Sequence, residues 1–137
     1  MSLEKEICQS GLKVVIAEDE NYNYLYLAAI LRKFKIEIIR AYNGKMAVDL
    51  CKTQPDIGLV LMDVGMPVMD GMEATRQIKT LRPNLPIIMQ TAFSDLTGRE
   101  ISLECGCDCV LFKPITKNDL ISSIEKYVPV ELVLEKA

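Results

Sequence analysis

The chain has 137 residues, of which 50% are hydrophobic and 26% are charged, and its formal net charge is -3. This length favours one domain with a core of ordinary size, and the apolar fraction excludes a disordered chain. The small negative charge argues against direct nucleic-acid binding through a broad basic surface, and the sequence has no apolar run long enough to span a bilayer.

The sequence contains no histidine. This absence removes Ser-His-Asp catalysis, imidazole acid–base chemistry and every metal site that uses a histidine ligand. Any chemistry must therefore come from carboxylates, lysine, hydroxyls or thiols.

We expect the chain to be divided into three parts. Residues 1–10 are predicted to be a leader or a vector-derived segment, residues 11–128 one folded domain, and residues 129–137 a C-terminal tail. Because no charged-then-apolar secretory leader is present, we expect a cytoplasmic protein.

The cysteines are Cys8, Cys51, Cys105, Cys107 and Cys109. Their odd number and the lack of an export signal argue against a disulfide framework. Two interpretations of the C-x-C-x-C cluster stay open. A thiolate metal site would need a distant fourth ligand, whereas small buried thiols need nothing further, and we favour the thiols.

The first half of the chain alternates between strand and helix patterns. Strands are predicted at 13–17, 36–41 and 57–62, and helices at 21–34, 45–52 and 71–81. The inward face of the first helix is predicted to carry Asn23, Tyr26, Leu27, Ile30, Leu31 and Phe34. The second helix is predicted to bury Met46, Ala47 and Leu50.

The alternation continues to the end of the domain. Strands are predicted at 86–91 and 110–112, and helices at 95–104 and 116–128. The last helix is predicted to begin at a cap, Thr116 or Asn118, and to bury Leu120, Ile121, Ile124 and Tyr127. Five strand–helix units in strict alternation predict an α/β fold, with a parallel sheet covered by helices on both faces.

Polar residues follow the predicted strands at the edge where such sheets bind ligands. They are Glu18 and Asp19 after the first strand, Asp63 after the third, Thr91 at the end of the fourth and Lys113 after the fifth. Clustered carboxylates repel each other unless a cation lies between them. Mg²⁺ suits such a site best because it accepts one or two carboxylates together with water and phosphate oxygens.

This combination is equipped for phosphoryl transfer. An ionised carboxylate can act as the nucleophile and become an aspartyl phosphate without a general base, which agrees with the absence of histidine. A metal ion and a lysine would neutralise the charge on the transferred group.

At these positions the chain resembles the receiver domains of two-component response regulators, over residues 12–128. The motifs are Glu18-Asp19, Leu61-Met62-Asp63 followed by Met66-Pro67 and Met69-Asp70-Gly71, then Gln90-Thr91-Ala92, and Lys113-Pro114. One motif alone is weak, whereas four in this order are specific. The resemblance implies a flavodoxin-like (βα)5 fold with a doubly wound five-stranded parallel sheet of strand order 2-1-3-4-5.

The resemblance also implies a Mg²⁺ site. Asp19 would bind the ion directly, and Glu18 would bind it directly or through water. Asp63 and the backbone carbonyl of Gly65 would complete the protein ligands.

Asp63 would be the phosphoacceptor in the same comparison. Thr91 would hydrogen-bond a phosphoryl oxygen, and Lys113 would pair with Asp63 and the phosphoryl group. The Lys113–Pro114 peptide bond would be cis, which is a small energetic demand for an X-Pro bond.

Two positions depart from the family pattern. Val110 stands where an aromatic side chain usually swings inward on phosphorylation, so an aromatic switch is not expected here. Gly65 stands where a large or polar residue is frequent.

The expected function is acceptance of a phosphoryl group from a phosphohistidine, followed by a conformational change in the segment 93–109 and the nearby loops. The expected partner is a histidine kinase or a histidine phosphotransfer domain. A second apolar stripe on the first helix, Tyr22, Leu25, Ala28 and Ala29, is either its docking face or a set of tolerated surface hydrophobics.

Two alternative functions stay open. An aspartyl-phosphate phosphohydrolase would use similar residues but normally needs a second Asp where this chain has Gly65. A phosphorylation-independent interaction module would not need the five site residues. The isolated domain is not expected to be an enzyme beyond self-phosphorylation and self-dephosphorylation.

The parent protein is a separate question. The acidic pair and the run from Met66 to Gly71 most resemble the receivers of hybrid sensor histidine kinases. By this analogy the domain is expected to be the cytoplasmic receiver of such a kinase, with no membrane contact of its own.

Overall fold

In the part of the chain that the structure describes, five strands and five helices alternate, as predicted. The computed structural model describes residues 11–92 and 96–129, so the predicted leader, Cys8, and residues 130–137 of the predicted tail lie outside it. The strands are β1 (Leu12–Ala17), β2 (Ile36–Ala41), β3 (Leu59–Asp63), β4 (Ile87–Thr91) and β5 (Cys109–Phe112). The helices are α2 (Asn21–Leu31), α3 (Gly44–Thr53), α4 (Gly71–Leu81), α5 (Gly98–Cys105) and α6 (Lys117–Tyr127).

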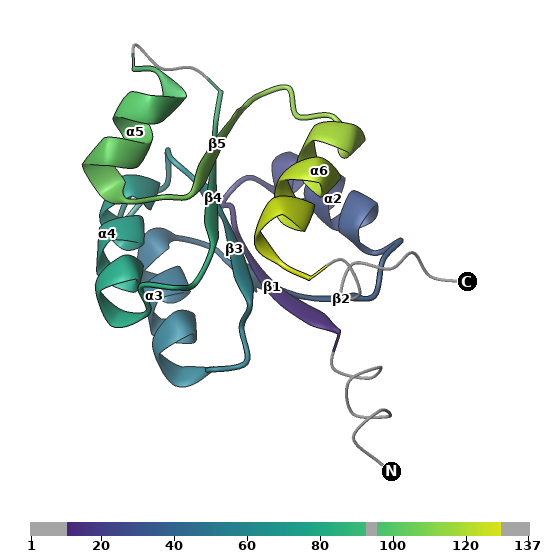
Figure 1. Cartoon of the computed structure of the whole chain (residues 1–137), viewed down its shortest axis with the longest axis horizontal. Helices are drawn as coiled ribbons and strands as arrows, with labels where there is room; N and C mark the ends of the chain where they lie inside the picture. Colours follow the sequence, from purple (N-terminus) through teal and green to yellow (C-terminus); the bar gives the residue numbers. More distant parts are fainter. Residues whose placement is uncertain (1–10, 93–95, 130–137) are drawn as a thin grey trace.

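The strands form one parallel sheet in the order β2-β1-β3-β4-β5, which confirms the predicted fold class (Figure 1). The order reverses at β1, so β1 and β3 lie side by side at the centre. Their carboxyl ends are level, since Ala17 pairs with Met62, and Asp63 pairs with Gln90 of β4. In an open sheet of this kind the carboxyl edge beside the reversal is the binding site.

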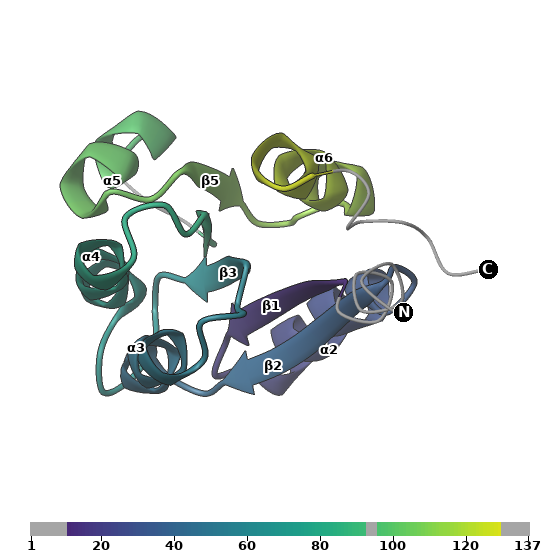
Figure 2. The ribbon, with the colours of Figure 1, turned by 60° about the horizontal axis from the view of Figure 1, so that its bottom comes forward.

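The sheet separates two apolar clusters. Helices α2 and α6 cover one face, and α3, α4 and α5 cover the other (Figures 1 and 2). Leu27, Leu31 and Ile124 belong to the first cluster, and Ile78 and Ile101 to the second. Every residue of β3 and β4 is buried, as their continuous apolar runs predict.

The predicted inward face of α2 is partly wrong. Tyr26 is 50% exposed, and Ala28, assigned to the outer stripe, is fully buried. The helix buries Leu27, Ala28, Ile30 and Leu31. A small side chain allows the closest approach to the sheet, so Ala28 faces it, whereas Tyr26 lies at the edge and donates its hydroxyl to the carbonyl of Ile115.

Helix boundaries and faces shift slightly elsewhere. Helix α5 begins three residues later than predicted because Thr97 caps it, accepting from the backbone N–H of Glu100. In α3 the buried positions include Val48 and Cys51, while Met46 and Leu50, which were expected inside, are only partly buried. The inner layer therefore prefers the smaller side chains.

Helix α6 also buries fewer of the expected side chains than predicted. Leu120 and Ile124 are buried as predicted, together with Ser123, whereas Ile121 and Tyr127 are only partly buried. Of the two predicted caps, Thr116 is the one that accepts a backbone hydrogen bond, from Asp119.

The C-x-C-x-C cluster does not gather three thiols. Cys105 and Cys107 are buried in the cluster under α3, α4 and α5, whereas Cys109 packs against the other cluster and its thiol lies 3.8 Å from the Ser123 hydroxyl. Cys51, Cys105 and Cys107 are buried and free, as small core thiols would be. Among the described residues, no helix has the length and apolarity needed to cross a bilayer.

Candidate functional site

Four strand ends open into one cleft. Glu18 and Asp19 follow β1, Asp63 ends β3, Thr91 ends β4, and Lys113 follows β5, and all five side chains line an open cleft of about 940 Å³. The parallel sheet brings these residues together because every strand ends at the same edge.

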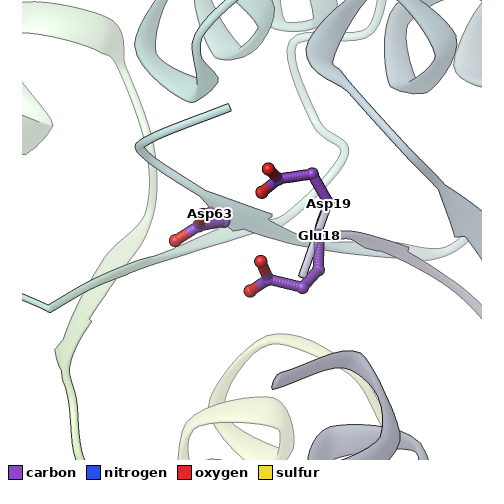
Figure 3. Close-up of side chains that lie close together, drawn as sticks. All are labelled: Glu18, Asp19 and Asp63. Carbon is purple, nitrogen blue, oxygen red and sulfur yellow. The ribbon is translucent and has the colours of Figure 1, made fainter. Parts of the chain in front are cut away.

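Three carboxylates form the acidic part of the cleft. One oxygen from each of Glu18, Asp19 and Asp63 lies within 4.8 Å of the others, and Figure 3 shows the first two beside the end of β3. Glu18 is 1% exposed and Asp63 6% exposed, whereas Asp19 faces solvent. This cluster can hold a metal ion.

Burial disfavours the ionised forms of the two buried carboxyl groups, Glu18 and Asp63. Burial raises the pKa of Glu18, and the neighbouring Asp63 adds to the rise. Burial also raises the pKa of Asp63, although the Lys113 ammonium opposes it. A cation bound beside Glu18 and Asp63 would favour the ionised forms of both carboxyl groups.

Lys113 is the cation of the cleft. Its ammonium lies 3.1 Å from Oδ1 of Asp63 and 3.6 Å from Oε1 of Glu18. Its backbone N–H donates to the carbonyl of Thr91 at 2.8 Å, which joins the ends of β4 and β5. The peptide bond to Pro114 is cis, as predicted.

Glu18 shows that the cleft suits a further cation. Its Oε2 accepts the backbone N–H of Glu20 at 3.1 Å. Its Oε1 is buried and, apart from the Lys113 ammonium 3.6 Å away, has no polar partner at hydrogen-bond distance within the described part of the chain. An unsatisfied buried carboxylate oxygen is costly, and oxygen atoms of this kind are the ligands of hard divalent cations.

The loop after Asp63 is closely packed at one end and open at the other. A Cβ on Gly71 would lie 2.1 Å from the Asp63 carbonyl oxygen, so only glycine fits there. Gly65 is exposed at the rim of the cleft, and a Cβ there would meet nothing within 4 Å.

The middle of this loop makes a tight turn. The backbone N–H of Met69 donates to the carbonyl of Pro67 at 2.7 Å, across Val68. Val68 has a φ of 69°, and its side chain is 82% exposed. This is a γ-turn with a β-branched residue at its centre, an unfavourable conformation for such a side chain.

Val110, the position of the missing aromatic, lies in the middle of β5. Its side chain is half-buried and packs toward the α4–α5 side, close to Gly98. Residues 93–95, part of the predicted moving region, lie outside the described residues.

No role was assigned from the sequence to two further polar residues near the strand ends, Arg40 and Gln90. Arg40 of β2 donates to the backbone carbonyl of Glu18. Gln90 of β4 is 3% exposed, and its Nε2 has no hydrogen-bond partner in residues 11–92 and 96–129. Applying the strand-end rule to 36–41 would have drawn attention to Arg40, because that strand also ends beside the acidic turn.

Comparison with known proteins identifies the family. The model of the response regulator receiver domain matches residues 14–125, and the chain belongs to this family. Sporulation initiation phosphotransferase F of Bacillus subtilis is 30% identical over 87% of this chain and 95% of its own length. The predicted function, a receiver domain of phosphorelay signalling, is confirmed at the level of the family.

Solved receiver structures agree. The receiver domain of the sensor histidine kinase PA1611 of Pseudomonas aeruginosa, with a magnesium ion coordinated in its active-site cleft, has a TM-score of 0.78 and 29% identity, covering 85% of this chain and 97% of that one. The receiver domain of the Saccharomyces cerevisiae response regulator Ssk1, solved with the histidine phosphotransfer protein Ypd1, has a TM-score of 0.79 and 29% identity, covering 90% and 92%.

Other relatives are much longer. The chain spans 14% of probable histidine kinase 4 of Oryza sativa and 13% of histidine kinase 3 of Arabidopsis thaliana, with 29% and 27% identity.

Proposed function

We propose that this receiver accepts a phosphoryl group from a phosphohistidine onto the carboxylate of Asp63. The observation that carries the proposal is the position of Asp63 between a cation and two further carboxylates. Lys113 lies 3.1 Å from it, and Glu18 and Asp19 lie within the same 4.8 Å cluster. A carboxylate placed so is both oriented and surrounded by groups that can hold a phosphate and its counter-ion.

In the proposed transfer, an oxygen of Asp63 forms a bond to phosphorus while the bond from phosphorus to the donor imidazole breaks. The released imidazole nitrogen keeps the electron pair and takes a proton from water. Lys113, held beside Oδ1, neutralises charge on the phosphoryl oxygens, and Thr91, at the end of β4 between Asp63 and Lys113, donates a hydrogen bond to one of them.

We further propose that the cation of this site is Mg²⁺. Glu18, Asp19, Asp63 and the backbone carbonyl of Gly65 would hold it, and the unsatisfied Oε1 of Glu18 supports this assignment. When bound, Mg²⁺ supplies the positive charge that offsets the clustered carboxylates and the incoming phosphate. The magnesium-bound receiver of PA1611 is consistent with this choice.

The proposed partner is the helical histidine-containing domain of a kinase or a phosphotransfer protein. The outer face of α2 carries four exposed residues at helical spacing, which we name the α2 stripe: Tyr22, Leu25, Tyr26 and Ala29. Tyr22 is 85% exposed and Leu25 55% exposed, next to the cleft. An apolar stripe at this spacing suits packing against another helix, and the Ypd1–Ssk1 complex shows that a relative binds such a domain.

A hybrid histidine kinase, with this receiver on its cytoplasmic side, is the proposed parent protein. The support is the similarity to two plant histidine kinases, of which the chain matches a short part. Phosphorylation would add about 1.5 to 2 negative charges at Asp63 and draw Lys113 and Thr91 toward it. The loops after β3 and β4 are the proposed moving parts.

The alternative of an aspartyl-phosphate phosphohydrolase is less well supported. Such an enzyme needs an acid two residues after the nucleophile, to protonate the leaving group. Here the position is Gly65, exposed and without a side chain.

Mass spectrometry tests the proposal. The protein would be incubated with acetyl phosphate and Mg²⁺, and again with EDTA in place of the metal. We expect one added phosphate in the wild type, none with EDTA, and none in Asp63→Asn. Asp49→Asn, which changes an exposed carboxylate on α3, is the matched control and should behave as wild type. An added phosphate that persists in Asp63→Asn would refute the site.

A further inference from the structure

The guanidinium of Arg40 contacts a backbone carbonyl, a side-chain amide and two aromatic rings beside the acidic turn, residues 18–20. Its Nε and Nη2 both donate to the backbone carbonyl oxygen of Glu18, each at 3.1 Å. Its Nη1 donates to Oδ1 of Asn21 at 2.9 Å. The guanidinium carbon lies 4.3 Å from the ring centre of Tyr24 and 4.2 Å from that of Tyr42.

These contacts determine the orientation of the guanidinium plane. Two donors on one carbonyl define both its distance and its direction, which a single donor cannot do. The rings of Tyr24 and Tyr42 restrict rotation of the planar group through cation–π contacts. The Arg40 guanidinium is therefore held in the orientation that donates to the Glu18 carbonyl.

The carbonyl that it holds belongs to the peptide bond between Glu18 and Asp19. The orientation of this peptide sets the directions of the two side chains on either side of it. One is buried and points toward Asp63, and the other faces the open cleft. The backbone N–H of Glu18 is held as well, by the carbonyl of Ala41 at 3.0 Å, so β2 holds the turn at two points.

We propose that Arg40 is a positioning residue for the cation site, acting through the Glu18–Asp19 peptide without touching the cation. This inference rests on the proposed function, in which those carboxylates bind Mg²⁺. It adds that the affinity of the site depends on a fork-shaped donor in β2. A positive charge at that position is not sufficient.

Replacement by lysine separates geometry from charge. Arg40→Lys keeps the positive charge but loses the second donor to the carbonyl and the flat face between the tyrosines. Arg82→Lys is the matched control, because Arg82 likewise donates to backbone carbonyls, from one nitrogen to those of Pro55 at 3.1 Å and Ile57 at 2.7 Å. Those carbonyls precede β3, at the opposite edge of the sheet from the cleft.

Titration calorimetry with Mg²⁺ is the first measurement. We expect the dissociation constant of Arg40→Lys to rise about tenfold, as is usual when a residue that orients metal ligands is replaced. Arg82→Lys should bind Mg²⁺ as the wild type does. Phosphorylation by acetyl phosphate is the second measurement: in Arg40→Lys the half-saturating Mg²⁺ concentration should rise by the same factor, while the rate at saturating Mg²⁺ should not change.

Each other outcome counts against the inference. Wild-type affinity in Arg40→Lys would overturn it. If Arg40→Gln then bound Mg²⁺ weakly, the positive charge alone would be what matters at this position. An equal loss in Arg82→Lys would show a general effect on folding. If the wild type bound no Mg²⁺, the proposed function would fail, and this inference with it.

Discussion

The ammonium of Lys113 donates to Oδ1 of Asp63 at 3.1 Å, although 50 residues separate the two in the chain. The contact crosses β4, from the end of β3 to the residue after β5. Because Lys113 opposes the effect of burial on the pKa of Asp63, it helps to keep the acceptor ionised. The same ammonium would stabilise the incoming phosphoryl group.

Replacing Lys113 by Gln should therefore slow phosphorylation for two reasons. The pKa of Asp63 should rise further, which reduces the ionised fraction of the nucleophile in acid, and a cation facing the transferred group is lost. We expect the rate with acetyl phosphate to fall about a hundredfold, the effect of removing one donor from such a site. Lys45→Gln, which changes an exposed lysine on α3, should leave the rate unchanged. An equal loss in both variants would contradict the assigned role.

In EDTA, the free energy of unfolding should fall as pH rises because folding raises the pKa of Asp63. The pKa of Asp63 in the folded protein lies above its ordinary value of 3.8, chiefly because of burial. The folded state therefore binds more protons than the unfolded state as pH rises above that value, and stability falls. Asp63→Asn should match the wild type in acid and be more stable at neutral pH.

Urea denaturation across the acid-to-neutral range is the measurement. Taking the difference between wild type and Asp63→Asn removes the contributions of the other carboxylates, which are common to both. A difference that does not change with pH would contradict the raised pKa.

Mg²⁺ should stabilise the folded protein through the same cluster. Binding to the folded state alone adds about 2.7 kcal/mol when the free ion is about one hundred times its dissociation constant. Asp19→Asn should lose most of this gain, since it removes a carboxylate of the trio. Glu20→Gln, at the exposed next position, should keep it. Thermal unfolding at increasing Mg²⁺ concentrations measures both, and equal loss in the two variants would argue against a specific site.

Two glycines of the loop after Asp63 should respond oppositely to alanine. The Cβ of Gly71→Ala would overlap the Asp63 carbonyl, and we expect a loss of about 1–3 kcal/mol or more in the free energy of unfolding. Gly65→Ala meets no atom within 4 Å and should be neutral or stabilising by about 0.4–1 kcal/mol. Chemical denaturation of both variants tests this, and similar stabilities would contradict it.

The α2 stripe should matter for the protein donor and not for small donors. The double variant Tyr22→Glu/Leu25→Glu should slow phosphoryl transfer from a phosphorylated histidine phosphotransfer domain, because it places charge in the apolar contact. Its reaction with acetyl phosphate should be unchanged. Leu103→Glu, an exposed apolar position on α5 across the sheet, is the control. Equal slowing with both donors would mean that the stripe does not dock the partner.

The strand ends were the most predictable part of the molecule. Asp63 follows an uninterrupted apolar run, and Lys113 follows a shorter one, so the run length and the change to a polar residue locate both. The parallel topology then brings them together without any knowledge of side-chain contacts.

The face of α2 was harder to predict for a physical reason. Tyrosine, leucine and alanine occur almost all round this helix, so no single stripe stands out in the sequence. Tertiary packing decides instead, which is why Ala28 faces the sheet and Tyr26 lies at its edge.

Arg40 could not be assigned a role from sequence alone. Its partners are a backbone carbonyl and two ring faces, and neither kind of contact leaves a motif. The unsatisfied oxygen of Glu18 is likewise a property of the packed cleft, because it depends on what surrounds the carboxylate in space.

The loop that follows Asp63 also has a mechanical consequence. Its two ends are tied, by the N–H of Gly71 to the carbonyl of Val64 at 2.9 Å and by the N–H of Gly44 to the carbonyl of Met69 at 3.1 Å. Gly71 is the first residue of α4 and Gly44 the first residue of α3, so the backbone after Asp63 is hydrogen-bonded to the start of two helices. A backbone shift at the acceptor would have to be accommodated at both helix starts.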